Sequence, residues 1–297
     1  MSVGSRNETD GVPGTRPVLS NSHWVDFAWR LSKNKVAVAA FAVFLLICLA
    51  CIFAPYITRW TYYEMNTNNI MQSPSSEHIL GTDNLGRDMF SRILYGGRMT
   101  LQIAFSSAIL ALVIGGALGL VAGYFGRWLD FIISPLLDII ASIPVLLLVI
   151  VCEAVLGWGR GNFRYALALA AIPQIARLTR ASVMNILGQE FIEAARALGV
   201  SHIGIISRHI LHNIAPPLII RFTSVLAEAL LTCTIMGYLG IVVSPPTPEW
   251  GFIVFAARSH IRANPQLMII PCAVIAICVL SISLFGDGLR DALDPRD

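Results

Sequence analysis

The sequence predicts an all-α integral membrane protein with six transmembrane helices. Of its 297 residues, 56% are hydrophobic and 13% are charged, and the mean hydropathy is +0.69. Globular proteins are closer to about half apolar and about a quarter charged. Six apolar stretches, separated by polar segments, are each long enough to cross a bilayer. The small net charge of +3 argues against a nucleic-acid partner.

The N-terminal region leads into the first span. Residues 1–22 are rich in Gly, Ser, Asn and Pro, which predicts a disordered cytoplasmic tail and no cleaved signal peptide. Residues 23–35 carry aromatic and basic side chains, and form either an interfacial helix on the membrane surface or the first turn of the span. Residues 36–53 carry no charge. Because basic residues precede this span, the positive-inside rule places the N-terminus in the cytoplasm.

An external loop and the second span follow. In residues 54–100, Thr82 or Asp83 is suited to cap a short helix that ends near Tyr95. The second span, residues 101–125, carries three glycines spaced four residues apart. One face of this helix is therefore bare backbone, which allows another helix to pack closely in lipid. The glycines are Gly115, Gly119 and Gly123.

The third span, residues 131–156, contains two prolines and two carboxylates. The prolines, which are expected to break the helix, are Pro135 and Pro144, and the carboxylates are Asp138 and Glu153. Carboxylates within a membrane face protein or water rather than lipid. We expect these two to form structural pairs or to reach the membrane interface, with a proton relay as the alternative.

The fourth and fifth spans enclose a segment of different composition. The fourth, residues 163–183, ends in Arg177 and Arg180, which suit lipid headgroups or a partner protein. The fifth, residues 214–239, begins with a proline pair that suits a first helical turn.

Between these spans, residues 184–213 have the composition of a soluble helix pair and lie on the cytoplasmic side. Glu190 and Glu193 suit the first turn of a helix. Gly199 fits the left-handed position that ends it, and Ser201 can cap a second helix. A hairpin of this kind, tied to a span at both ends, needs a partner on which to dock.

A polar stripe runs along the fifth span. Arg221 and Glu228 share one face and lie about 10.5 Å apart along the axis, which is far for direct pairing. The stripe predicts either the lining of a translocation pathway or contact with another subunit, and the alternatives stay open. Thr232 and Met236 are further candidates for pathway lining.

The remainder of the chain completes the topology. Residues 240–266 are expected to be an external loop, with a stiff proline-rich part at residues 244–251. Residues 267–285 form a charge-free sixth span. An even number of spans returns the C-terminus to the cytoplasm.

Several kinds of chemistry have no supporting motif in the sequence. There is no G-x-x-x-x-G-K-[ST] phosphate loop and no H-E-x-x-H or G-x-S-x-G motif. We therefore expect no catalytic residue, no metal site and no enzyme activity, and an energy source in another protein. The six cysteines lie in apolar spans and are expected to be buried thiols. A secondary transporter is the alternative from a different class, although the sequence lacks the expected repeat symmetry.

Four sequence blocks resemble ABC-importer permeases of the dipeptide/oligopeptide/nickel family, in particular the second permease subunit. The blocks are Leu80-Gly81-Thr82-Asp83 with Gly86-Arg87-Asp88; Glu193-Ala194-Ala195 with Gly199; Pro245-Pro246-Thr247-Pro248-Glu249-Trp250-Gly251; and Gly286-Asp287-Gly288-Leu289-Arg290-Asp291-Ala292-Leu293-Asp294-Pro295. The second block is the EAA motif of ABC importers, and the other three are specific to the peptide/nickel subfamily.

This resemblance implies a type I ABC-importer permease fold in a bacterial cytoplasmic (inner) membrane. It implies a heterodimer with a paralogous permease, two cytoplasmic ATPase subunits that bind ATP and Mg, and an external solute-binding protein. The chain itself is expected to carry no cofactor. The implied cargo is a peptide, and relatives that carry nickel chelates, glutathione or antimicrobial peptides supply the alternatives.

The resemblance also implies roles for individual residues. The candidates for contact with the ATPase are Glu193, Ala194, Ala195, Arg196 and Gly199. The candidates for docking of the solute-binding protein are Arg87, Asp88, Pro246, Glu249 and Trp250. Where the family usually has Leu-Pro after the second hairpin helix, this chain has Leu211-His212. The second helix is therefore expected to continue into the fifth span.

Overall fold

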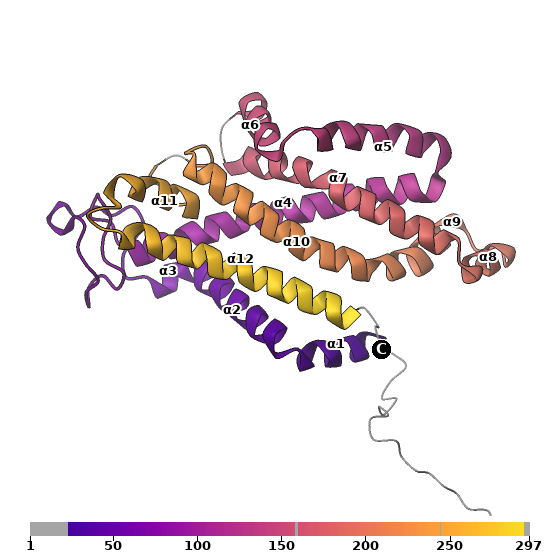
Figure 1. Cartoon of the computed structure of the whole chain (residues 1–297), viewed down its shortest axis with the longest axis horizontal. Helices are drawn as coiled ribbons and strands as arrows, with labels where there is room; N and C mark the ends of the chain where they lie inside the picture. Colours follow the sequence, from indigo (N-terminus) through magenta and orange to yellow (C-terminus); the bar gives the residue numbers. More distant parts are fainter. Residues whose placement is uncertain (1–22, 158–159, 244, 294–297) are drawn as a thin grey trace, which may run out of the picture.

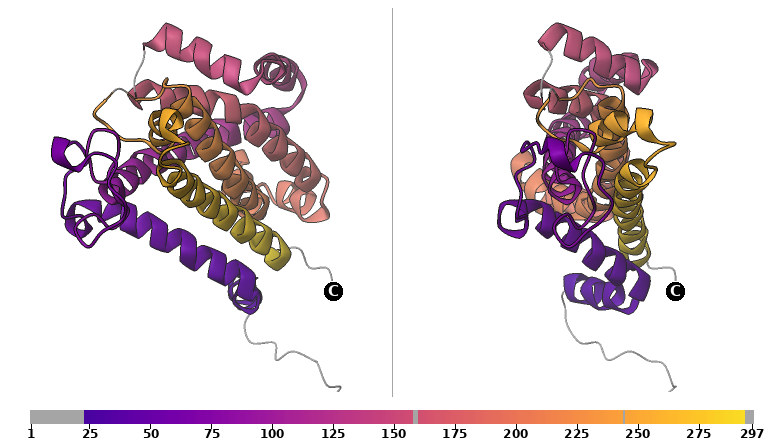
Figure 2. Two further views of the ribbon diagram at one scale, coloured as in Figure 1. Left: turned by 60° about the vertical axis from the view of Figure 1, so that its left-hand side comes forward. Right: turned by 90° about the vertical axis from the view of Figure 1, so that its left-hand side faces the viewer.

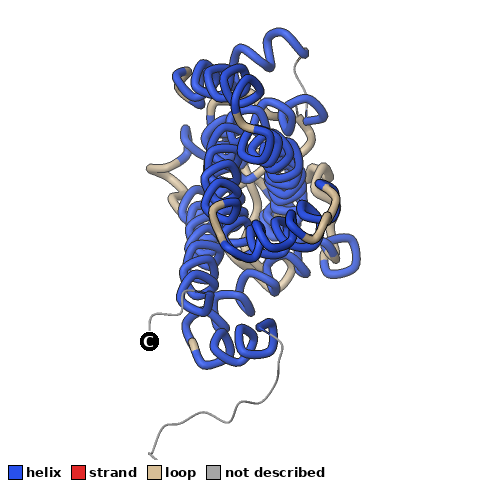
Figure 3. Tube along the Cα trace, turned by 90° about the vertical axis from the view of Figure 1, so that its right-hand side faces the viewer, coloured by secondary structure: helices blue, strands red, loops and turns tan. Residues whose placement is uncertain are grey.

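The computed structural model describes residues 23–157, 160–243 and 245–293, and this part of the chain is built of helices and loops (Figure 3). The predicted disordered tail, residues 1–22, lies outside the described residues. Long helices run roughly side by side along the longest axis (Figure 1). The segment before α4, together with α11, lies at one end of the molecule, and α8 and α9 lie at the other.

The described ranges contain twelve α-helices, and the longest connection between them lies before α4. They are α1 (His23–Lys33), α2 (Lys35–Ile52), α3 (Ala54–Ile57), α4 (Met89–Phe125), α5 (Arg127–Ser142), α6 (Val145–Leu156), α7 (Arg160–Leu187), α8 (Glu190–Ala197), α9 (His202–Gly204), α10 (Leu211–Tyr238), α11 (Trp250–Ala257) and α12 (Gln266–Leu293). Two 3-10 turns, η1 (Thr67–Asn69) and η3 (Arg258–His260), and one π-helical turn, η2 (Ile205–Ile210), complete the set.

The helices are less uniform than six equivalent spans. Among the described residues, four helices are long and apolar enough to cross a membrane: α2, α4, α12 and the continuous helix His202–Tyr238. The pair α5 and α6 makes a fifth only if its 97° bend is counted within one span. The predicted fourth span lies in α7, whose 28 residues are about 42 Å long but include several arginines.

Several predicted helix boundaries were wrong. The helix expected to be capped by Thr82 or Asp83 begins instead after Asp88, whose side chain accepts a hydrogen bond from Ser91 N. That helix does not end near Tyr95, because α4 continues for 37 residues through the second span. In the third span α5 runs through Pro135, and the break falls at Ile143, which is extended before Pro144.

The glycine stripe of α4 packs against α7, as the spacing predicted. A Cβ atom on Gly115 would lie 2.8 Å from the carbonyl oxygen of Ile172, and one on Gly123 would lie 2.9 Å from that of Arg180. At Gly119 the contact with Ala176 O is closer still. Backbone therefore meets backbone along three successive turns, which only glycine permits.

Two further glycines bring α12 close to neighbours on opposite sides. A Cβ on Gly286 would collide with Thr223 of α10, and one on Gly288 would collide with Ala37 of α2. Figure 2 shows α2 lying along α12, with α10 on the other side of α12. The Gly-Asp-Gly sequence near the C-terminus thus joins α2, α10 and α12, and leaves Asp287 between the two contacts.

Ion pairs fasten α5 to α7. Arg180 Nε lies 2.5 Å from Asp130 Oδ1, and Arg177 Nη2 lies 2.7 Å from Asp138 Oδ1. The structural pairing expected for Asp138 is confirmed. Both of these α7 arginines therefore pair with carboxylates of α5. Glu153 is fully buried in α6.

We expect Gly119→Ala to lower the thermal unfolding midpoint of the purified protein, because the new Cβ would push α4 away from the Ala176 carbonyl. Gly116→Ala is the matched control, since nothing lies within 4 Å of a Cβ there. That control should be neutral or slightly stabilising, because alanine favours a helix by up to about 1 kcal/mol over glycine. Equal midpoints for the two variants would contradict close packing of α4 on α7.

Candidate functional site

Within the predicted segment 184–213, the hairpin comprises residues 188–210, and its first arm is α8. The two faces of α8 differ in exposure. Glu193, Ala194 and Arg196 are exposed, whereas Ala195 is buried and Ile192 is completely buried. The inward residues therefore fix the helix to the molecule, and the outward ones remain free to meet a partner.

The turn of the hairpin is a Schellman motif centred on Gly199. Its φ angle is +75°. Gly199 N donates to the carbonyl of Arg196 at 3.0 Å, and Val200 N donates to that of Ala195 at 3.1 Å. These bonds satisfy carbonyls that the end of α8 would leave unpaired. The left-handed ending predicted for Gly199 is confirmed.

The second arm of the hairpin is continuous with the fifth span. Ser201 accepts a hydrogen bond from Gly204 N at 3.2 Å, which confirms it as the cap. From there one unbroken helix runs from His202 to Tyr238, as expected from the missing proline at position 212. Pro216 and Pro217, which were expected to suit a first helical turn, lie inside this continuous helix instead.

An apolar cluster attaches the hairpin to the membrane helices. Its buried members are Val183, Ile192, Ile205, Ile210 and Ile214. They come from α7, α8 and the continuous helix. At its edge, Tyr124 Oη and His202 Nδ1 form a hydrogen bond of 2.6 Å, which ties the end of α4 to the second arm. The hairpin is therefore fixed to three membrane helices.

Large apolar side chains are exposed on the hairpin itself. Leu198 is 84% exposed and Ile203 is 79% exposed, and Phe191 is also exposed. Next to them lie the charged side chains of Glu193 and Arg196. Clustered exposed apolar groups with a polar rim are typical of a protein-binding surface.

A cavity of about 770 Å³, here called the pathway cavity, lies between α10 and α12. Both the stripe residues Arg221 and Glu228 line it, together with Asp287 and Arg290 of α12. Opposite charges therefore balance around the cavity. The remaining lining is apolar or hydroxyl-bearing.

Arg221 and Glu228 contact each other, contrary to the prediction from helix rise. Arg221 Nη2 lies 3.5 Å from Glu228 Oε1, because the long arginine side chain crosses the two turns between them. The same nitrogen donates to Gln174 Oε1 of α7. The side chains are 28% and 52% exposed, so this long ion pair remains accessible from the cavity.

A smaller cavity of about 250 Å³ extends the polar stripe past Glu228. Thr232 and Gln174 line it, and Glu228 borders both cavities. Met236 does not belong to this surface, since it is fully buried in an apolar cluster with Phe163. Three of the four pathway candidates thus share one surface, and the fourth belongs to the core.

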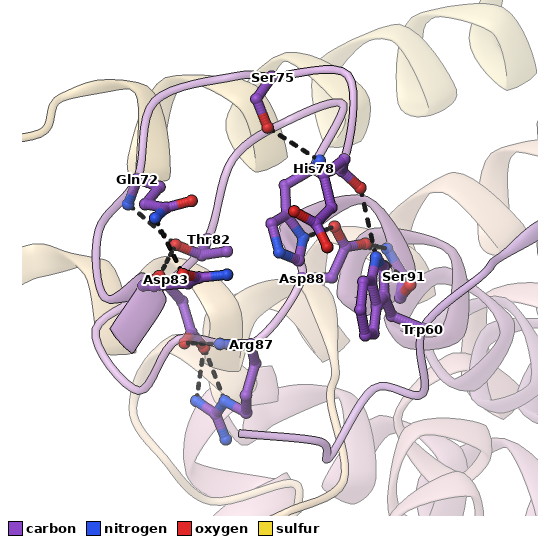
Figure 4. Close-up of polar contacts among 11 residues, drawn as sticks. Trp60, Gln72, Ser75, His78, Thr82, Asp83, Arg87, Asp88 and Ser91 are labelled. Atoms are coloured by element: carbon purple, nitrogen blue, oxygen red, sulfur yellow. Dashed lines mark hydrogen bonds and ion pairs between the residues drawn. The ribbon is translucent and has the colours of Figure 1, made fainter. Parts of the chain in front are cut away.

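The segment before α4 is held by two buried polar clusters (Figure 4). In one, Asp83 accepts from Arg87 Nε at 2.7 Å and lies 3.3 Å from Arg92 Nε. In the other, His78 Nδ1 lies 2.9 Å from Asp88 Oδ1, and Asp88 caps α4. Arg87 and Asp88 are each 4% exposed, so they stabilise the loop and are not free to dock a partner.

The second docking block is also buried where it meets the helices. Trp250 is completely buried, and its Nε1 donates to the carbonyl of Ile93 at 2.9 Å. Glu249 is completely buried as well, capping α11 by accepting from Phe252 N at 2.9 Å. It also accepts from Thr100 Oγ1 at 2.9 Å. Of the five docking candidates, only Pro246 is exposed.

The Glu249 carboxyl occupies an unusual environment for an acid. Burial raises its pKa to about 7, although hydrogen bonds from Gly251, Phe252, Thr100 and Trp250 lower it. A Cβ on Gly237 would collide with its Oε2 atom, so α10 lies directly against the carboxyl. Glu249 thereby joins α11 to α4 and to the C-terminal end of α10.

Sequence reasoning missed several contributors. Gln174, Thr100 and His78 are ordinary polar residues in sequence, and no spacing rule links them to partners far along the chain. Asp287 and Arg290 belong to a block that was quoted without a role for either residue. The doubled glycine around Asp287 was the signal, since it marks close helix contacts that would expose the intervening side chain.

The described part of the chain was compared with the requirements of a metal-binding site. No group of three or more His, Cys, Asp or Glu side chains there could hold a metal ion. The six cysteines are free thiols.

Known proteins match the chain over nearly its whole length. Residues 115–296 match the family described as "Binding-protein-dependent transport system inner membrane component", and residues 22–74 match "N-terminal TM domain of oligopeptide transport permease C". The dipeptide transport system permease protein of Alkalihalophilus pseudofirmus is 41% identical, over 97% of this chain and 95% of its own. The di/tripeptide transport system permease protein of Pseudomonas aeruginosa is 37% identical, over 98% of this chain and 98% of its own.

Two further matches extend the comparison. The glutathione transport system permease protein of Pectobacterium atrosepticum is 36% identical, over 96% of this chain and 95% of its own. Among solved structures, an inward-facing conformation of the MetNI methionine ABC transporter aligns with a TM-score of 0.58 and 24% identity. It covers 69% of this chain and 98% of that one. The likeness shows the predicted ABC-importer permease fold.

The Glu249 environment predicts a pH-dependent stability. Its raised pKa means that the folded protein retains a proton that the unfolded chain loses, so stability falls as pH rises from about 4.5 to about 7 and then levels off. We expect the unfolding midpoint of Glu249→Gln to change less over this range than that of the wild type. Glu77→Gln alters an exposed carboxylate and should follow the wild-type profile. Parallel profiles for Glu249→Gln and wild type would contradict the assignment.

Proposed function

Because the chain belongs to the family of binding-protein-dependent transport system inner membrane components, we propose that it is one permease subunit of an ATP-driven importer of short peptides. The observation that carries this proposal is the continuous helix His202–Tyr238, which joins the exposed hairpin to the pathway cavity. Relatives named for dipeptide and di/tripeptide transport support the peptide cargo. Membership of this family replaces the secondary-transporter hypothesis.

The energy for transport comes from separate ATPase subunits. The sequence has no phosphate-binding loop, so ATP and Mg bind to those partners. Their contact surface is the exposed part of the hairpin: Leu198 and Ile203 supply apolar area, and Glu193 and Arg196 supply charge. Ala195 faces inward and supports α8 rather than touching the ATPase.

Motion of the hairpin would be transmitted along its second arm. Since the arm and the fifth span are one helix, a displacement at Leu198 moves the Arg221–Glu228 segment with it. Rigid-body movement of a helix that borders a cavity changes the width of that cavity. ATP-driven docking and release of the hairpin would thus open and close the pathway.

The chain supplies half of the pathway, and a paralogous permease supplies the other half. Helices α10 and α12 and the edge of α7 form the wall of the pathway cavity, and the cavity is open on its remaining side. Its balanced charges suit a zwitterionic peptide better than a cation or an anion. Glutathione is the second candidate cargo, favoured by the 36% identical glutathione permease protein.

The external partner is a solute-binding protein. Since most docking candidates are buried, it meets exposed residues of the same loops, among them Pro246 and Leu85. The end of α12 and α1 lie toward the hairpin end of the molecule (Figure 1), which agrees with both termini in the cytoplasm.

The function is tested by peptide uptake into vesicles that contain the assembled transporter. Uptake of a radiolabelled dipeptide should require ATP, the solute-binding protein and this chain. An excess of unlabelled dipeptide should compete, and glutathione should compete less. ATP hydrolysis by this chain alone, or uptake without the ATPase subunits, would refute the proposal.

We expect Gly199→Val to reduce uptake at least ~10-fold, because a β-branched residue resists the left-handed conformation that the hairpin turn requires. Gly199→Asn should retain most activity, since asparagine tolerates that conformation. Membrane insertion of both should be normal. Gly188→Ala, on the same hairpin but without a positive φ, is a second control. Wild-type uptake by Gly199→Val would show that the hairpin turn does not couple the ATPase subunits to transport.

Exchanging the two charges of the stripe tests whether Arg221 and Glu228 only form a structural pair or also line the pathway. The double variant Arg221→Glu with Glu228→Arg keeps an ion pair but reverses its direction. We expect it to assemble normally yet to transport at least ~5-fold more slowly, because a peptide would meet the opposite charges. Restoration of full uptake would mean that the pair is only structural.

A further inference from the structure

A second large cavity lies between α2 and the body of the molecule, and of its lining residues only Thr223 also lines the pathway cavity. Its volume is about 690 Å³, within the usual range for small-molecule sites of roughly 300–1,000 Å³. Helices α2, α4, α10 and α12 all contribute to its wall. It is called here the α2 groove, and its lining is mostly aliphatic and aromatic.

Phenylalanines form much of the groove. Phe41 of α2 contacts Phe285 of α12 with ring centroids 4.7 Å apart, and Phe44 of α2 stacks on Phe105 of α4 at 6.0 Å. Phe222 of α10 also lines the groove. Helix α2 is thus held to its neighbours at discrete points, and apolar space remains between them.

One end of the groove is polar. Arg98 and Gln102 of α4 line it there, four residues apart and therefore on the same helix face. Both side chains are exposed. Arg98 forms no hydrogen bond or ion pair with any residue that the structure describes. A cation beside an apolar groove, without a carboxylate to neutralise it, fits an amphipathic anion.

The length and position of the groove match one leaflet of a bilayer. On α2 its lining extends from Phe41 to Ile52, about 16 Å along the axis. Half of a bilayer hydrocarbon core is about 15 Å. The Arg98 end coincides with the end of α2, because Cys51 lies against Gly97, the residue before Arg98. Arg98 therefore lies at the level where lipid headgroups begin.

We propose that the α2 groove binds a glycerophospholipid, with an acyl chain along the phenylalanines and the phosphate on Arg98. Gln102 donates a further hydrogen bond to the phosphate or the ester oxygens. The lipid fills the space between α2 and α10 and joins α2 to the other helices. This site lies on a different side of α10 from the polar stripe and is independent of the transported cargo.

Native mass spectrometry of the complete transporter, purified in mild detergent, tests the proposal. We expect the wild type to retain a phospholipid per copy of this chain, and to regain it from phosphatidylglycerol after delipidation. Arg98→Ala should lower this occupancy at least fivefold, whereas Arg98→Lys should preserve most of it. The matched control is Arg262→Ala, which removes an exposed external arginine outside the groove. Equal occupancy in Arg98→Ala and wild type would overturn the proposal.

A second pair of measurements keeps the test valid if Arg98→Ala does not assemble. Leu45→Trp fills the groove without a change of charge, and it should also displace the lipid. A photo-crosslinking amino acid at Gln102 should capture phospholipid in the assembled complex. Capture of another transporter subunit instead would show that the groove is a protein interface and would overturn the lipid assignment.

Discussion

The fold depends on one constraint: a single helix, from His202 to Tyr238, begins in the hairpin and ends against Glu249 and α11. Its two prolines do not divide it. Whatever acts on the hairpin therefore acts on the part of the helix that borders the pathway cavity.

Each end of the helix is fixed by a different kind of contact. At the hairpin end, the turn at Gly199 and the cap at Ser201 set the geometry of the hairpin. At the opposite end, Gly237 allows the buried carboxyl of Glu249 to lie against the backbone. Along its side, Gly286 of α12 permits close approach to Thr223. Glycine contacts of this kind give close packing without relying on large side chains.

Local features were predictable from the sequence, and long-range ones were not. The ending at Gly199 and the packing of the α4 glycines follow from residue type and spacing alone. The docking candidates Arg87 and Trp250 were assigned wrongly because an external loop was assumed to be open to solvent. Their burial depends on partners such as Asp83, close in sequence, and Ile93, far from Trp250 in sequence, whose positions only the fold defines. The rise of the helix alone also gave the wrong expectation for Arg221 and Glu228, because a side chain as long as arginine can cross two helical turns.

The most direct test of the account is a distance measurement within the continuous helix. Ile203 and Leu239 are both exposed and can carry spin labels. Pulsed electron paramagnetic resonance would then measure the distance between the two labels in the assembled transporter. We expect the same distance with and without ATP, while a label at Leu198 moves relative to the partner permease. A change in the distance from Ile203 to Leu239 between the two states would mean that the helix bends, and would contradict rigid coupling of the hairpin to the pathway.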